Sequence, residues 1–139
     1  MSVQSAPPKS RPEIAEAVHE QMLELAYIPS FNHGHPAAFE FARQISRLTP
    51  GELDYVFFAN SGSEAVETAL KIALLYHRAE GEGQRMRLVG RERGYHGVTI
   101  MSGGMTGLPG VHAGFDLPLP FVKHTTAPHR LWEGQGLSD

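Results

Sequence analysis

Apolar residues recur every three or four positions over two stretches in the N-terminal part of the chain, residues 11–26 and 37–48. The first set is Ile14, Val18, Met22 and Leu25, and the second is Ala38, Phe41, Ile45 and Leu48. This spacing predicts two amphipathic helices, because it gathers the apolar side chains on one helical face. Ser10 and Glu13 have the spacing of a capping box before the first helix, and Thr49-Pro50-Gly51 ends the second.

The middle of the chain has the pattern of a strand, a turn and a long helix. Tyr55–Ala59 is short, apolar and aromatic, which predicts a strand buried on both faces. A turn of small residues leads into residues 61–79, which are rich in alanine, contain no helix breaker and predict a closely packed helix. A second strand is expected around Leu88-Val89. After Ser102, frequent glycines and prolines predict an irregular tail.

Composition narrows the class of protein. The chain has 139 residues, a net charge of −3 and no cysteine. This length fits one globular domain, and the charge gives no basic field for nucleic acid or an anionic membrane. The lack of cysteine excludes disulfides and thiolate metal sites. No apolar run reaches the ~20 residues that span a bilayer, and residues 1–12 lack the apolar stretch of a secretory signal. We expect a cytoplasmic location.

The turn Ser61-Gly62-Ser63-Glu64 has features of an anion pocket. The first N–H groups of a helix have no internal partner and lie at the positive end of its dipole. Gly62 allows an anion to approach the backbone, and the two serine hydroxyls can donate further hydrogen bonds, so the turn can bind a phosphate. The alternative is that Ser61 simply caps a buried helix.

A second candidate motif is Gly94-Tyr95-His96-Gly97. The tyrosine face can stack on a flat heteroaromatic ligand, and the imidazole can hydrogen-bond or exchange protons near neutral pH. The alternative is a glycine-rich turn that carries a core tyrosine.

Together the two motifs identify a family. The run Ser-Gly-Ser-Glu-Ala-Val-Glu-Thr-Ala-Leu-Lys (61–71), followed by Gly-Tyr-His-Gly (94–97), resembles the class III pyridoxal-phosphate-dependent aminotransferases, in the branch of the ω-amino acid:pyruvate aminotransferases. The resemblance implies an α/β fold: a partial fold type I large domain, α/β/α, truncated at both ends. We expect a disordered leader at 1–10, the partial cofactor-binding domain at 11–107 and the irregular tail at 108–139.

The resemblance also assigns roles. Ser61, Gly62 and Ser63 match the segment that binds the phosphate of pyridoxal 5'-phosphate, Tyr95 matches the ring stacked on the pyridine, and His96 matches a supporting histidine. The parent enzyme, expected to be a homodimer, moves an amino group from an amine or ω-amino acid to a keto acid such as pyruvate. Glu64 fits a helix cap better than a catalytic acid.

The resemblance leaves catalysis incomplete. In the family, the Schiff-base lysine and the carboxylate at the pyridine nitrogen lie beyond the end of this chain, so we expect no catalytic residue here and no activity from the chain alone. Lys71 matches a structural lysine and lies about 12 Å along the helix from Ser63 at roughly 1.5 Å per residue. The alternatives are a non-catalytic phosphate-binding module or a docking piece for a full-length aminotransferase.

The same likeness bears on folding. The family's strands at 55–59 and 88–89 are not neighbours in the sheet, so we expect exposed strand edges and a poorly stable chain.

Two other clusters carry weaker signals. His33 and His35 are two residues apart in a loop without nearby acidic or thiol ligands, so we expect no metal site. Four arginines fit a solvated face around a strand, with an interface or a site for an acidic ligand as the alternatives: Arg85, Arg87, Arg91 and Arg93.

Overall fold

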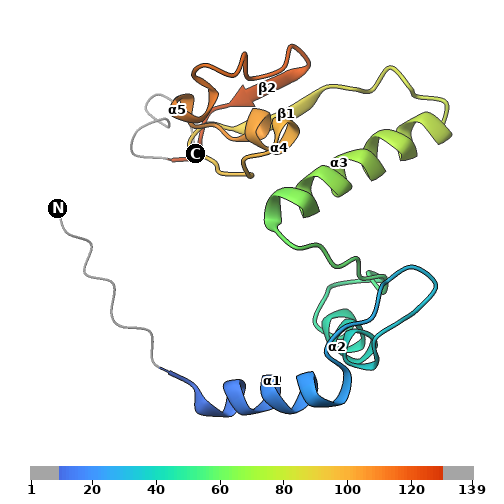
Figure 1. Cartoon of the computed structure of the whole chain (residues 1–139). Coiled ribbons are helices and arrows are strands. Elements are labelled where there is room, and N and C mark those ends of the chain that lie inside the picture. The colour runs from blue at the N-terminus through green and yellow to red at the C-terminus, as the bar shows by residue number, and fades with distance from the viewer. Residues whose placement is uncertain (1–9, 130–139) are drawn as a thin grey trace. The chain divides into compact units, whose positions relative to one another are not determined.

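The computed structural model describes residues 10–129, and the leader expected at 1–10 lies outside this range except for Ser10. The chain forms two compact units, Met1–Val56 and Phe57–Asp139 (Figure 1). The domain boundaries expected after residues 10 and 107 stay predictions. No helix within the described range has both the length and the apolar composition needed to cross a lipid bilayer.

The first unit contains two helices, α1 (Pro12–Leu25) and α2 (Pro36–Ser46), and both were predicted. The capping box predicted for α1 is wrong, because Arg11 and not Ser10 occupies the position before the first turn. The Glu13 carboxylate pairs with the Arg11 guanidinium instead of reaching back to the backbone. Pro12 is the first helical residue, where its missing N–H costs no hydrogen bond.

His35 joins the two helices. Its Nδ1 accepts a hydrogen bond from the Ala37 N–H at 3.1 Å and so caps the start of α2. Its Nε2 then carries the proton and donates to the Leu25 carbonyl, 3.2 Å away at the end of α1. The neighbouring His33 places Nδ1 3.0 Å from the Phe31 carbonyl. Both imidazoles are therefore engaged with the backbone.

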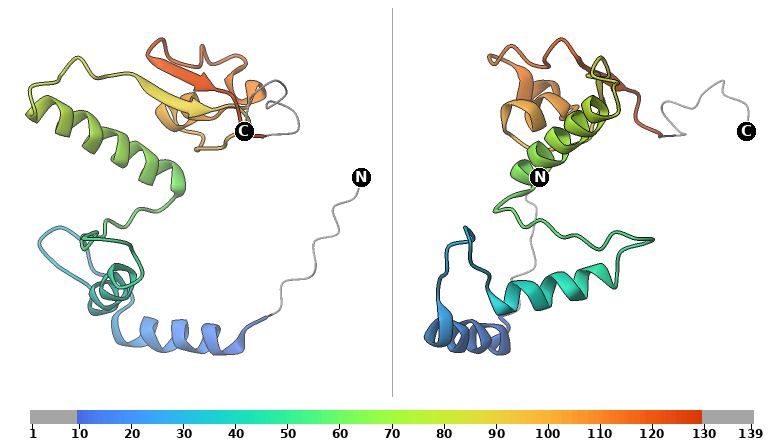
Figure 2. Two further views of the ribbon diagram at one scale, coloured as in Figure 1. Left: turned by 180° about the vertical axis from the view of Figure 1, so that it is seen from behind. Right: turned by 90° about the vertical axis from the view of Figure 1, so that its right-hand side faces the viewer.

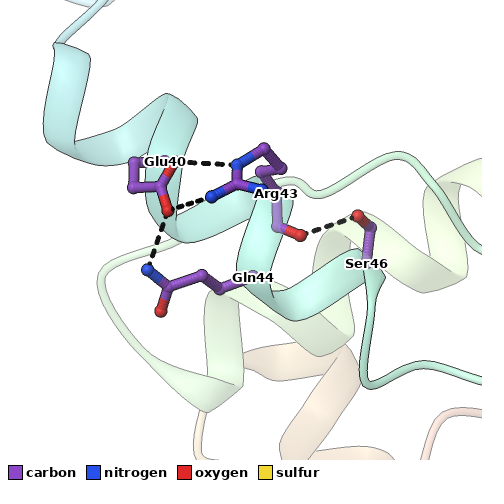
Figure 3. Close-up of polar contacts among 4 residues, drawn as sticks. All are labelled: Glu40, Arg43, Gln44 and Ser46. Atoms are coloured by element: carbon purple, nitrogen blue, oxygen red, sulfur yellow. Dashed lines mark hydrogen bonds and ion pairs between the residues drawn. The ribbon is translucent and has the colours of Figure 1, made fainter.

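An exposed polar cluster lies on α2 (Figure 3). The Arg43 guanidinium donates to both carboxylate oxygens of Glu40, with Nε 2.8 Å from Oε2 and Nη2 2.6 Å from Oε1. Gln44 Nε2 donates to Oε1 at 2.9 Å. These hydrogen bonds, the two from Arg43 foremost, favour the charged carboxylate and lower the pKa of Glu40 to about 2.

We expect Arg43→Met to raise the pKa of Glu40 toward its ordinary value of 4.5, because the largest cause of the shift is lost. Arg47→Met, the control, removes a charge that only acts at a distance and should raise it far less. Because the folded pKa is the lower one, the stabilisation is present above pH 4.5 and is lost as the pH falls toward 2. An NMR titration of the Glu40 carboxyl carbon measures this. Equal pKa values in wild type and Arg43→Met would contradict the assignment.

The second unit combines helices with a small parallel sheet. It contains α3 (Gly62–Ala79), β1 (Leu88–Arg91), α4 (Ile100–Met105), α5 (Pro109–His112) and β2 (Val122–Thr125). The strands pair in parallel from Leu88 opposite Val122 to Arg91 opposite Thr125, and Figures 1 and 2 show them side by side. Helix α4 packs on both strands, and Val122, Ser102 and Thr106 are buried there. The strand predicted around Leu88-Val89 is confirmed.

Two further predictions are wrong. Tyr55–Ala59 is not a strand: no strand of the described chain pairs with it, so its backbone gains no ladder, and the Tyr55 side chain is 99% exposed. The tail is not wholly irregular, because α5 and β2 lie in it. Residues 121–127 contain no proline or glycine, and this stretch is long enough to form the four-residue strand β2. One edge of β1 is paired with β2, and no strand of the described chain pairs with its other edge.

Gly107 brings the end of α4 against the end of β1. Its N–H donates to the Gly94 carbonyl at 2.7 Å, and its carbonyl accepts the Arg93 N–H at 2.7 Å. A Cβ at this position would lie 2.0 Å from the Arg91 carbonyl oxygen and 2.7 Å from the Glu92 Cα. These are backbone atoms, so they cannot rotate away.

We therefore expect Gly107→Ala to lower the free energy of unfolding by about 3 kcal/mol or more, because β1 and the end of α4 must separate. Urea denaturation measures the change. Gly110→Ala is the matched control, because a Cβ there meets nothing within 4 Å and alanine favours the helix. Equal midpoints for the two variants would contradict the close approach at Gly107.

Candidate functional site

The start of α3 is capped by its own side chains. Ser61 has extended backbone, and its Oγ accepts the Glu64 N–H at 3.2 Å. The Glu64 carboxylate reaches back and accepts the Asn60 N–H at 3.0 Å. The cap predicted for Ser61 and Glu64 is confirmed, and Glu64 is occupied by it.

The cap leaves two backbone donors available. The N–H groups of Gly62 and Ser63 belong to the first helical turn, where no helical carbonyl can accept them, and they have no acceptor within the described part of the chain. A Cβ on Gly62 would meet no atom within 4 Å, so the approach is open. An 18-residue helix directs the positive end of its dipole at this position. The turn can thus hold an anion as well as cap the helix.

The two sequence motifs meet at Ser63. Its Oγ accepts the Val98 N–H at 3.1 Å, across 35 residues of sequence. The approach depends on Gly97, whose φ is +132°. A Cβ on Gly97 would lie 2.6 Å from Ser63 Oγ and 2.4 Å from Ser102 Oγ. The start of α3 and the Gly94–Gly97 turn are therefore in direct contact.

Tyr95 and His96 differ in exposure. Tyr95 is 63% exposed, so the alternative of a core tyrosine is wrong and its ring is available to a ligand. His96 is half-buried, and its backbone N–H donates to Thr106 Oγ1 at 2.9 Å. Sequence reasoning placed both residues at the edge of a site, and the structure puts them in the turn that contacts α3.

Two residues that hold this turn were missed from the sequence. Thr106 is fully buried, and besides accepting the His96 N–H its hydroxyl can donate to the Gly97 carbonyl at 3.0 Å. Glu67 lies on α3 and accepts hydrogen bonds from the start of α4. Two features of the sequence could have indicated them. Thr106 is a hydroxyl residue beside Gly107, and Glu67 is an acidic residue four positions after Ser63, on the same helical face.

Other reactive side chains lie away from this turn. Lys71 lies two turns along α3, where it lines a cavity with Phe57 and Thr68, and Lys123 is exposed on β2. Within residues 10–129, no three histidine, aspartate or glutamate side chains are grouped as they must be to hold a metal ion.

Comparison with known proteins finds relatives that are aminotransferases. The family model described as aminotransferase class-III matches residues 8–135. An omega-aminotransferase of Caulobacter vibrioides is 51% identical over 87% of this chain and 28% of its own length. A beta-alanine–pyruvate aminotransferase of Pseudomonas aeruginosa is 43% identical over 93% of this chain and 28% of its own length.

Solved structures that resemble this chain are also transaminases. A transaminase with L-alanine matches 94% of this chain with a TM-score of 0.87 and 39% identity, over 31% of its own length. An (S)-enantioselective omega-transaminase from Thermomicrobium roseum matches 94% of this chain with a TM-score of 0.86 and 37% identity, over 29% of its own length. The chain thus spans less than a third of these relatives, and its fold is part of their α/β fold. This chain belongs to the class III aminotransferases.

Proposed function

We propose that this chain forms the phosphate-binding part of the pyridoxal 5'-phosphate site of an ω-amino acid:pyruvate aminotransferase. The observation that supports it most directly is the 3.1 Å hydrogen bond from the Val98 N–H to Ser63 Oγ, because it joins the anion-binding turn to the segment with the exposed tyrosine. Relatives named as omega-amino acid–pyruvate and beta-alanine–pyruvate aminotransferases support these substrates.

The residues of the site fit this cofactor. The free N–H groups of Gly62 and Ser63, with the hydroxyls of Ser61 and Ser63, match a phosphate in charge and hydrogen bonding. The exposed Tyr95 ring offers a stacking face for the pyridine, and we assign the supporting role to His96, which follows it in the same turn. When bound, the cofactor supplies an electron-accepting ring for moving an amino group.

We further propose that the 139-residue chain does not transaminate by itself. Transamination requires a lysine amine at the reactive carbon of the cofactor. Of the three lysines, Lys9 lies outside the described residues, Lys71 lies two turns from the anion-binding turn, and Lys123 is on β2. The contribution of this chain is therefore to bind and orient the cofactor.

Calorimetric titration with pyridoxamine phosphate tests the binding proposal. That form lacks the aldehyde and cannot attach to stray lysines. We expect saturable binding of one equivalent, with binding of pyridoxamine, which lacks the phosphate, weaker by about tenfold or more. A flat titration would overturn cofactor binding. Formation of L-alanine from pyruvate and β-alanine by the purified chain with pyridoxal phosphate would overturn the proposed lack of catalysis.

A second candidate function is docking onto a full-length aminotransferase protomer. One observation favours it: a cavity of about 650 Å³ along α3 is lined largely by apolar side chains, among them the exposed Phe57, Ile72 and Leu75. Light scattering of the chain mixed with a full-length relative separates the two candidates. A stable complex in size-exclusion chromatography with light scattering would favour docking. Elution of the two proteins as separate species would rule docking out.

A further inference from the structure

Glu67 ties α3 to the segment that follows the Gly94–Gly97 turn. Its Oε1 accepts hydrogen bonds from Thr99 Oγ1 at 2.5 Å, from the Met101 N–H at 3.0 Å and from the Ser102 N–H at 3.4 Å. Both backbone donors belong to the first turn of α4, where no helical carbonyl can accept them, and the Ser102 N–H is shared with the Thr99 hydroxyl of the helix's own capping box. One carboxylate oxygen on α3 thus adds to the cap at the start of another helix and is the acceptor for the Met101 N–H.

The same face of α3 makes a second contact with this segment. Glu67 follows Ser63 by four residues, so the two side chains lie one above the other on the helix. Ser63 Oγ accepts the Val98 N–H at 3.1 Å. The face formed by these two residues therefore makes hydrogen bonds with Val98 and with residues 99–102.

The turn is held from its other side by Thr106. Its Oγ1 accepts the His96 N–H at 2.9 Å and lies 3.0 Å from the Gly97 carbonyl oxygen, so it secures the turn to the end of α4. Glu67 secures the start of the same helix to α3. Helix α4 therefore helps to fix the position of Tyr95 relative to the first turn of α3, and the Glu67 carboxylate is the group that attaches α4 to α3.

We propose that Glu67 is a positioning residue for the cofactor, one that fixes the Tyr95 turn relative to the phosphate-binding start of α3. The inference rests on the proposed function, because it presumes that the phosphate lies at Gly62 and Ser63. Glu67 acts through α4 and does not touch the cofactor. Inorganic phosphate binds to the start of α3 alone, whereas pyridoxamine phosphate contacts both the start of α3 and Tyr95. Loss of Glu67 should therefore lower the affinity for pyridoxamine phosphate and leave the affinity for inorganic phosphate nearly unchanged.

Two substitutions separate positioning from general support. Glu67→Leu removes every acceptor at similar volume. Glu67→Gln keeps an oxygen of the same reach, and because all the contacts go to Oε1 it can preserve them. Glu92→Gln is the matched control, because it removes the same charge from an exposed residue next to β1.

The experiment combines calorimetry with hydrogen exchange on the full chain. For Glu67→Leu we expect affinity for pyridoxamine phosphate to fall about tenfold or more, and affinity for inorganic phosphate to change less than about threefold. Exchange should accelerate over residues 94–102 and stay unchanged in β1 and β2. Glu67→Gln and Glu92→Gln should bind both ligands within about threefold of wild type.

Each outcome decides a separate point. Equal losses for the two ligands in Glu67→Leu, or faster exchange throughout the unit, would overturn positioning and leave a merely structural residue. Wild-type affinity in Glu67→Leu would also overturn it while the proposed function stands. A wild-type chain that binds neither ligand would overturn the proposed function and the inference with it.

Discussion

Gly62→Asp is expected to abolish binding of pyridoxamine phosphate, with affinity reduced about 100-fold or more. The new side chain meets no atom within 4 Å of its Cβ, so it fits without a clash. An acidic residue in the first turn of α3 also suits the helix dipole, so folding is preserved. The carboxylate, however, competes for the free N–H groups and repels the phosphate. Calorimetry measures the loss, and thermal unfolding checks that the fold is retained.

Gly62→Ala is the control for this substitution. It adds the same Cβ without a charge and meets no protein atom within 4 Å, so it reports the effect of the Cβ on the approaching phosphate, and its affinity should fall less than that of Gly62→Asp. If Gly62→Asp titrated like wild type, the phosphate would not bind at the start of α3. If Gly62→Ala lost binding as fully as Gly62→Asp, steric access and not charge would explain both.

Gly97→Ala is expected to destabilise the second unit by about 2–4 kcal/mol and to abolish cofactor binding. The φ of +132° disfavours any residue with a Cβ. The added Cβ would also lie 2.6 Å from Ser63 Oγ and 2.4 Å from Ser102 Oγ, so the turn must move away from α3. Urea denaturation measures the loss of stability, and calorimetry with pyridoxamine phosphate measures the loss of binding.

Gly114→Ala provides the comparison. Gly114 also has a positive φ, +80°, but a Cβ there meets nothing within 4 Å. Its substitution should cost about 1 kcal/mol from backbone conformation alone and leave binding unchanged. The difference between the two variants reports the close packing of Gly97 against Ser63 and Ser102, together with the stricter backbone at φ +132°. Equal destabilisation would mean that the Gly97 contact with Ser63 contributes nothing.

The helices were predictable because their signals are local. Apolar spacing gives α1 and α2, and the pair Ser61 and Glu64 marks the start of α3. The same reasoning failed at Ser10, because a residue two positions before Glu13, Arg11, captured its carboxylate. Such local competition between charged neighbours is not encoded in the spacing of a capping box.

The strands were less predictable because a strand depends on its partner. Tyr55–Ala59 has the composition of a buried strand but lacks a paired neighbour in the described chain, so it stays irregular. Val122–Thr125 has a weaker pattern and becomes a strand because β1 pairs with it. Helix α4 begins where Glu67 supplies an acceptor, although its sequence contains Gly103 and Gly104.

The site was predictable as two motifs but not as one place. Small residues before a helix and an aromatic residue between glycines identify Gly62 and Tyr95 by residue type. Their proximity comes from the contact between Ser63 and Val98, 35 residues apart, which no local pattern specifies. Thr106 and Glu67 act only through this tertiary arrangement, so sequence reasoning passed over them.

The central claim is that the start of α3 and the Tyr95 turn form one cofactor site. A ¹H–¹⁵N NMR titration of the full chain with pyridoxamine phosphate tests it most directly, because it locates binding residue by residue. We predict saturable shifts at the amides of Gly62, Ser63 and Tyr95, with little change in α1 and α2. Shifts at Gly62 and Ser63 without Tyr95, or shifts confined to other parts of the chain, would contradict a single site.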